Sequence, residues 1–233
     1  MGTNVEDRKT AQAREAAKPA QGGLKRPGAS KGEKALAADL VGPIALSQDV
    51  KAGEGLRPED AIKYRAAVKE YTKTIQSNPK DALAYHNRAV AHCRLGSYQQ
   101  AVHDFTNAIK FDPNNATVYY NRAIAYGALG KSKQAIEDGT KAIELKAKDA
   151  NAYMNRGIDY MALGDGDRAV KDLNTAVQFS PQDASAYYAR GVGYYKLGSK
   201  ELALKDFKKA AQMGHKQAGQ YLKSQGGIAI ASR

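Results

Sequence analysis

The sequence has few of the residues that form disulfides, thiolate metal sites or membrane spans. It contains one cysteine, no tryptophan and no run of about 18 uncharged apolar residues. The lone Cys93 excludes an internal disulfide and a metal site with four thiolate ligands. The lack of a long apolar run argues against a transmembrane helix. Tyrosine, by contrast, occurs 14 times, which suggests a repeated unit with tyrosine as its large packing residue.

Charge of one sign is in excess, and the excess is unevenly distributed. The 233 residues carry a formal charge of +12. Residues 1–60 hold ten Lys or Arg and nine Asp or Glu. Residues 61–233 hold 26 Lys or Arg and 15 Asp or Glu. The folded part is therefore expected to carry the positive field, which attracts acidic proteins, nucleic acid or anionic lipid.

Residues 1–57 are expected to form an N-terminal arm that is disordered or becomes ordered on a partner. Its first 34 residues are rich in Ala, Lys, Arg, Gly and Pro and lack the periodicity of a helix or a strand. Charged residues from Glu6 to Lys9 stand where the apolar core of a secretory signal would develop. A cytoplasmic location is therefore predicted, with export left open.

From Pro58 onward the chain repeats itself with a period of 34 residues. Each unit carries Tyr at its fourth position, a Leu-Gly pair at its fourteenth and fifteenth, and Ala at its twentieth. Glycine can adopt the left-handed conformation that ends a helix, and proline near the end of a unit cannot continue one. Each unit is therefore predicted to form two helices. The four full units are residues 82–115, 116–149, 150–183 and 184–217.

This spacing, with Tyr at position 4, Gly or Ala at 8, Ala at 20 and 27 and Pro at 32, resembles the tetratricopeptide repeat family over residues 82–217. The resemblance implies an all-α fold, a right-handed α-solenoid of antiparallel helix pairs. Residues 58–81 match only the second half of a unit. Residues 218–225 resemble the capping helix that ends such arrays, and residues 226–233 are expected to form a tail.

Opposite charges recur in step with the repeat, Arg at position 7 and Asp at position 23. They predict structural ion pairs that join the two helices of a unit or neighbouring units. The alternative is two independent solvated faces. The residues concerned are Arg88, Arg122, Arg156 and Arg190 with Asp104, Asp138, Asp172 and Asp206.

The sequence offers little for catalysis. Its four histidines belong to no metalloprotease motif, and no nucleophile elbow or phosphate-binding glycine loop is present. His92 replaces a packing tyrosine of the repeat, and Cys93 lacks an evident histidine with an orienting partner. We therefore predict that the protein is not an enzyme and uses no cofactor or metal.

The resemblance implies that the first helices of successive units line a concave inner surface. Position 6 on that surface is Asn87, Asn121 and Asn155, and an amide can donate to and accept from one peptide unit of a bound chain. Repeats stack about 8–10 Å apart, close to the roughly 10 Å that three extended residues span. The alternative is that asparagine is favoured there for packing alone.

Other residues of this surface indicate which ligand it would prefer. Tyr120, Met154 and Tyr188 make the wall apolar, which favours a hydrophobic segment or an amphipathic helix. Arg94 and Lys196 at position 13 would select an acidic ligand.

These observations favour an adaptor that binds a segment of a partner protein in its concave groove. An alternative is a structural subunit of a larger assembly, docked through the N-terminal arm. A weaker alternative is nucleic-acid binding through the basic C-terminal repeat; against it, the tyrosines recur at packing positions. The sequence does not decide whether the protein forms homo-oligomers.

Overall fold

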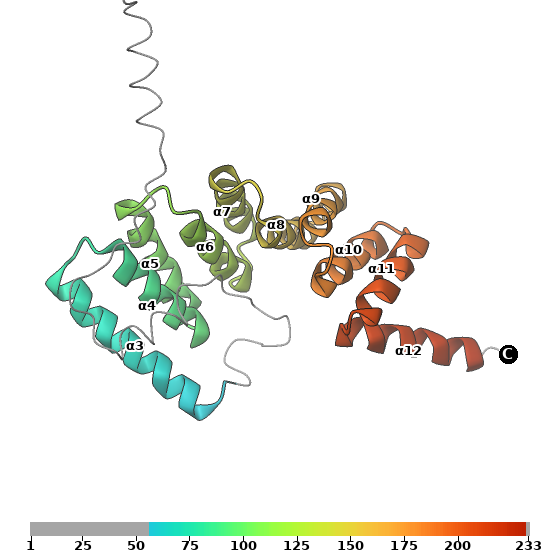
Figure 1. The fold of residues 1–233 in the computed structure, drawn as a ribbon, viewed down its shortest axis with the longest axis horizontal. Coiled ribbons are helices and arrows are strands. Elements are labelled where there is room, and N and C mark those ends of the chain that lie inside the picture. The colour runs from blue at the N-terminus through green and yellow to red at the C-terminus, as the bar shows by residue number, and fades with distance from the viewer. Residues whose placement is uncertain (1–55, 232–233) are drawn as a thin grey trace, which may run out of the picture. The chain divides into compact units, whose positions relative to one another are not determined.

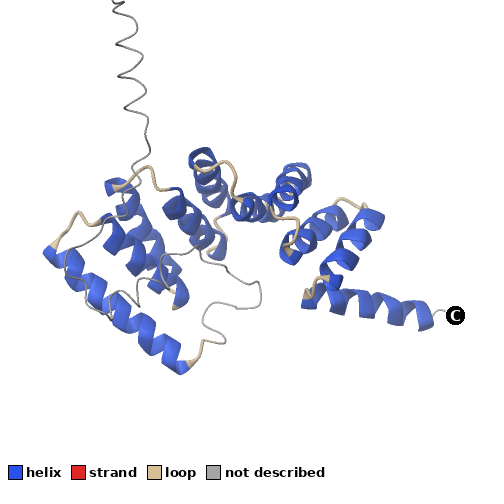
Figure 2. Ribbon diagram, viewed as in Figure 1, coloured by secondary structure: helices blue, strands red, loops and turns tan. Residues whose placement is uncertain are grey.

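The structure is a computed structural model that describes residues 56–231, with side chains described as far as Lys223. The predicted N-terminal arm thus lies outside the described residues, except for its last two. The described part of the chain consists of helices joined by short loops and contains no strand (Figure 2). Its helices are α3 (Pro58–Ser77), α4 (Ala82–Arg94), α5 (Tyr98–Phe111), α6 (Ala116–Ala128), α7 (Ser132–Leu145), α8 (Ala150–Ala162), α9 (Gly166–Phe179), α10 (Ala184–Lys196), α11 (Lys200–Gln212) and α12 (Lys216–Ala231).

The helices pack in chain order, as Figure 1 shows. Within each sequence unit the two helices form an antiparallel pair, α4 with α5, α6 with α7, α8 with α9 and α10 with α11. The second helix of each pair also packs on the first helix of the next, and α3 packs on α4 in the same way. This is the predicted all-α solenoid.

Local sequence explains where the helices begin and end. Pro58 occupies the first turn of α3, where its missing N–H is not needed. The side chain of Asp81 accepts a hydrogen bond of 2.8 Å from the backbone N–H of Ala84 and so caps the start of α4. The first helix of each pair ends at a glycine with positive φ, as at Gly96 (φ 74°) and Gly164 (φ 80°), where a Cβ would be strained.

Small residues allow the two helices of a pair to approach closely. The alanine at position 20 of every unit is at most 1% exposed. In the last two units position 8 is glycine: a Cβ on Gly157 would lie 2.9 Å from the side chain of Leu173, and one on Gly191 would lie 2.7 Å from the ring of Phe207. The large side chain at position 24, Leu173 or Phe207, thus fills the space that the missing Cβ of the glycine leaves.

The C-terminal helix differs from the prediction. It begins at Lys216 and continues to Ala231, so it exceeds the cap expected at 218–225 and includes most of the tail expected at 226–233. The prediction ended the cap at residue 225, just before the two glycines at 226 and 227. Glycine costs only about 1 kcal/mol in a helix interior and does not end a helix by itself. None of the helices in the described part is long and apolar enough for a membrane span.

Candidate functional site

The charges at positions 7 and 23 form one ion pair in every full unit. Each arginine donates two hydrogen bonds, from Nε and from one terminal nitrogen, to both oxygens of its aspartate, at 2.6–2.9 Å. The aspartates are buried and the arginine side chains are 14–19% exposed. Through its hydrogen bonds, Asp104 raises the pKa of Arg88, and Asp172 likewise raises the pKa of Arg156. These pairs join the two helices of a unit.

The remaining terminal nitrogen of each arginine connects neighbouring units, a contact that the sequence analysis missed. It donates a hydrogen bond of 3.0 Å to position 25 of the unit before. A polar acceptor recurring at position 25 was the available signal. The acceptors are Thr72, Thr106, Thr140 and Asn174.

The three asparagines do not form the accessible row that was expected. Asn87 and Asn121 are 2% and 0% exposed, and only Asn155 is partly accessible. The physical reason is that position 6 lies at the seam between successive first helices, which contact one another. At that seam Asn155 donates a hydrogen bond of 3.1 Å to the hydroxyl of Tyr120, at position 5 of the unit before. The expectation of an asparagine ladder is therefore wrong for Asn87 and Asn121.

A cleft of about 930 Å³ is lined by residues of α6, α8 and α10. The turn between α11 and α12, Met213 to Gln217, contributes to its lining. Its wall is mostly apolar and includes Tyr120, Met154 and Tyr188, and the ring of Tyr188 stacks on His215 with centroids 4.3 Å apart. A largely apolar cleft of this size with a few polar groups is typical of ligand sites.

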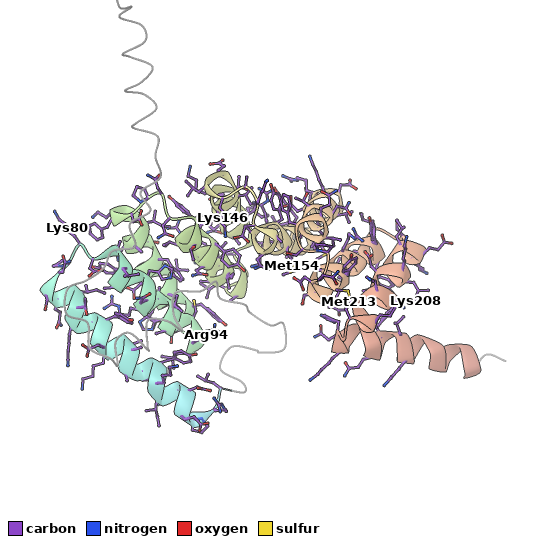
Figure 3. All side chains as sticks on the ribbon, viewed as in Figure 1. Lys80, Arg94, Lys146, Met154, Lys208 and Met213 are labelled. Atoms are coloured by element: carbon purple, nitrogen blue, oxygen red, sulfur yellow. The ribbon has the colours of Figure 1, made fainter. Side chains whose placement is uncertain are left out.

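The two basic residues predicted for the groove do not line this cleft. Lys196 points toward the backbone, where its Nζ lies 3.5 Å from the carbonyl oxygen of Met161. Arg94 lies on α4, and Figure 3 shows it well apart from the cleft residues Met154 and Met213. On α4, His86, Asn87 and Val90 are buried, whereas Leu83 is 38% exposed. Accordingly, no preference for an acidic ligand follows from the cleft.

A buried carboxyl lies in the cleft that sequence analysis did not single out. Asp159 on α8 is 9% exposed and accepts a hydrogen bond from the hydroxyl of Ser132 at the start of α7. Burial raises the pKa of Asp159 to about 7, and the bond from Ser132 opposes this. Position 10 is Ala91, Ala125 and Gly193 in the other units, so comparing the units in register would have revealed it.

Burial shifts the pKa of two side chains, His86 and Cys93, of the kinds that bind metals or act as nucleophiles. Within the described range no group of three or more His, Cys, Asp or Glu could hold a metal ion. Burial lowers the pKa of His86 to about 4 and raises the pKa of Cys93 to about 12. The Cys93 side chain is therefore a protonated thiol near neutral pH, and it packs as a small apolar group.

The basic end of the described chain is not purely basic. A hollow of about 650 Å³ between α10 and α11 is lined by Lys205, Lys208 and Lys209 but also by Glu201 and Asp206. Lys208 is labelled in Figure 3 on α11. Asp206 is buried and paired with Arg190, which also lines the hollow, so the three lysines and Glu201 leave this surface with a net positive charge.

Comparisons with known proteins agree with the repeat pattern. The family model described as TPR repeat matches residues 92–130 and 157–198, and two models described as tetratricopeptide repeat match residues 70–103 and residues 116–149 with 184–213. No curated protein sequence matches the chain.

Solved structures share the fold at low sequence identity. The crystal structure of MamA has 24% identity and a TM-score of 0.63, covering 69% of this chain and 94% of its own. YrrB, described as a TPR protein with an unusual peptide-binding site, has 22% identity and a TM-score of 0.61, covering 71% and 86%. A thermophilic TPR protein of Thermus thermophilus, TTC0263, has 22% identity and a TM-score of 0.57, covering 72% and 91%. At these identities the likeness concerns the fold alone.

Proposed function

We propose that the protein is a non-enzymatic adaptor that binds a peptide segment of a partner protein. The chain belongs to the tetratricopeptide repeat family, whose fold serves as a scaffold for protein interactions. The segment lies in the cleft across α6, α8 and α10. The observation that carries this proposal is the cleft itself, which spans three successive first helices and is mostly apolar.

The cleft offers more to apolar side chains than to a peptide backbone. Ile124, Met154 and Ile158 present aliphatic and thioether groups, which adapt to differently shaped apolar partners. Of the predicted carboxamides, only Asn155 lines the cleft, and it already donates to Tyr120. Affinity would therefore come mainly from burying apolar side chains of the segment, and the amides of Asn151, Asn155 and Gln217 would contribute to orientation.

The architecture also favours a ligand-binding role over a purely structural one. The pairs within and between units hold the first helices in a fixed register, so the cleft is formed before a ligand arrives. A preformed site loses less conformational freedom on binding than one that must be ordered first. YrrB, which shares this fold, is described as having a peptide-binding site, and that description is compatible with the proposed role.

The test uses a phage-displayed library of short random peptides selected against the full chain. Selected peptides should bind the wild type and lose on the order of tenfold or more in affinity when Ala162→Trp fills the cleft, because Ala162 is an exposed residue of its lining. Gln178→Trp, a bulky substitution at an exposed position of α9 outside the cleft lining, should leave affinity unchanged. Failure to select any peptide, or equal binding by Ala162→Trp, would refute the proposal.

A further inference from the structure

The carboxyl of Asp159 has no counter-charge within the described part of the chain. No Lys, Arg or His side chain of that part forms an ion pair with it, whereas each ladder aspartate is held by an arginine. Among the described residues, the hydroxyl of Ser132 donates a hydrogen bond to this carboxyl. A carboxyl that is 9% exposed and without a cation is costly to keep ionised.

The unit before Asp159 supplies both the space and the hydrogen bond for this carboxyl. Gly127 on α6 leaves the room: a Cβ there would lie 3.3 Å from Oδ1 of Asp159. Ser132 on α7 is itself 8% exposed and donates to the carboxyl. Position 10 is alanine or glycine in the other units, so the helix packing does not need a carboxyl there. An acid that packing does not require, set in a ligand-sized cleft, suggests a functional role.

The rest of the cleft determines which ligand could use this acid. The neighbouring wall residues Ile124, Met154 and Ile158 are apolar. The basic side chains of the lining, His215 and Lys216, come from the turn before α12 and the first residue of α12. The other carboxylate of the lining, Asp183, already accepts a hydrogen bond of 2.8 Å from the backbone N–H of Ser185 as the cap of α10. The wall therefore suits apolar side chains on either side of a positive group that pairs with Asp159.

We propose that Asp159 is a specificity-determining residue that binds a lysine or arginine side chain of a peptide whose flanking residues are apolar. The inference rests on the proposed function, because it names the ligand chemistry of the same cleft. It reverses the acidic preference expected from Arg94 and Lys196, neither of which lines the cleft. A cation at Asp159 would supply the missing counter-charge in a site shielded from water, where such a pair discriminates strongly between partners.

The experiment compares peptide selections on the wild type and on Asp159→Asn at about pH 8, where the carboxyl is ionised. The wild type should enrich peptides with Lys or Arg at a fixed position between apolar residues. Asp159→Asn should still enrich apolar peptides but lose the basic position. The matched control Asp167→Asn changes an exposed aspartate of α9 outside the cleft lining and should select as the wild type does.

A double-mutant cycle then measures the pairing directly. Replacing the basic residue of a selected peptide by norleucine should weaken binding to the wild type on the order of tenfold or more and leave binding to Asp159→Asn unchanged. Peptides that lack a basic residue, or that bind Asp159→Asn as tightly as the wild type, would overturn the role of Asp159 and leave the adaptor proposal standing. If no peptide is selected at all, both proposals fail. Thermal unfolding of each variant verifies that it is folded.

Discussion

The buried carboxyl of Asp159 predicts that, at neutral pH, the wild-type protein is less stable than a variant with an uncharged residue at this position. In the folded chain, burial raises the pKa of Asp159 to about 7 from its ordinary value of 3.8. A raised acid pKa means that the folded state holds the proton more tightly than the unfolded state. The resulting stabilisation is complete below about pH 4 and is lost as the pH rises through about 7.

The size of this effect follows from the same two values. At 1.36 kcal/mol per pKa unit, the difference between 3.8 and about 7 is on the order of 4 kcal/mol. Asparagine resembles the protonated acid in shape and carries no charge to desolvate. Asp159→Asn should therefore equal the wild type at about pH 4 and exceed its stability by up to a few kcal/mol at about pH 8.

Urea unfolding followed by circular dichroism at both pH values measures this difference. The comparison between variant and wild type cancels the titration of the other carboxyls, and Asp167→Asn, at an exposed position, should show no pH-dependent gain. An advantage of Asp159→Asn that stays constant or shrinks between about pH 4 and pH 8 would show that the carboxyl is solvated or paired, and the reasoning would be wrong. If Asp159→Asn is more stable than the wild type but no longer binds cationic peptides, the wild-type carboxyl lowers stability and contributes to ligand recognition.

Three further predictions concern the repeat framework. Arg156→Met leaves its partner carboxylate buried without a cation and should destabilise the fold by about 3–5 kcal/mol; a change in unfolding free energy below about 1 kcal/mol would contradict a structural role. Gly191→Ala places a Cβ 2.7 Å from the Phe207 ring and should cost about 1–3 kcal/mol, whereas Gly219→Ala meets no atom within 4 Å and should stabilise slightly; thermal melts of both variants check the contrast. Cys93, whose thiol pKa burial raises to about 12, should react with a thiol reagent at about pH 8 only as fast as the protein unfolds; fast labelling of the native protein would disprove this.

The fold could be predicted because its determinants are local and periodic. The Leu-Gly pairs mark helix ends that the structure shows as left-handed glycines, for example at Gly96. The recurring tyrosine and alanine positions specify two helices per unit without reference to the rest of the chain. Where a single unpatterned stretch had to be interpreted, as at the glycines after residue 225, the prediction ended the helix too early.

The site was harder to predict because accessibility depends on neighbouring units. The asparagine at position 6 recurs as regularly as any core residue, yet Asn121 is buried and Asn155 is partly accessible. Periodicity identifies which residues are equivalent, but it does not report what covers each of them. Asp159 is the opposite case, because it is a carboxyl at a position that is alanine or glycine in the other units. A search for residues that recur in every unit does not find it.

The contacts between units also indicate how far the units are interchangeable. Because each full unit offers an equivalent arginine and most offer an equivalent acceptor, a unit could be duplicated or lost in steps of 34 residues without leaving a connector unmatched. That interchangeability stops at α11, where position 25 is Lys208. An ammonium group cannot accept from a guanidinium and would repel it. A further unit of the same kind would therefore pack on α11 without the guanidinium hydrogen bond that joins each earlier pair of units.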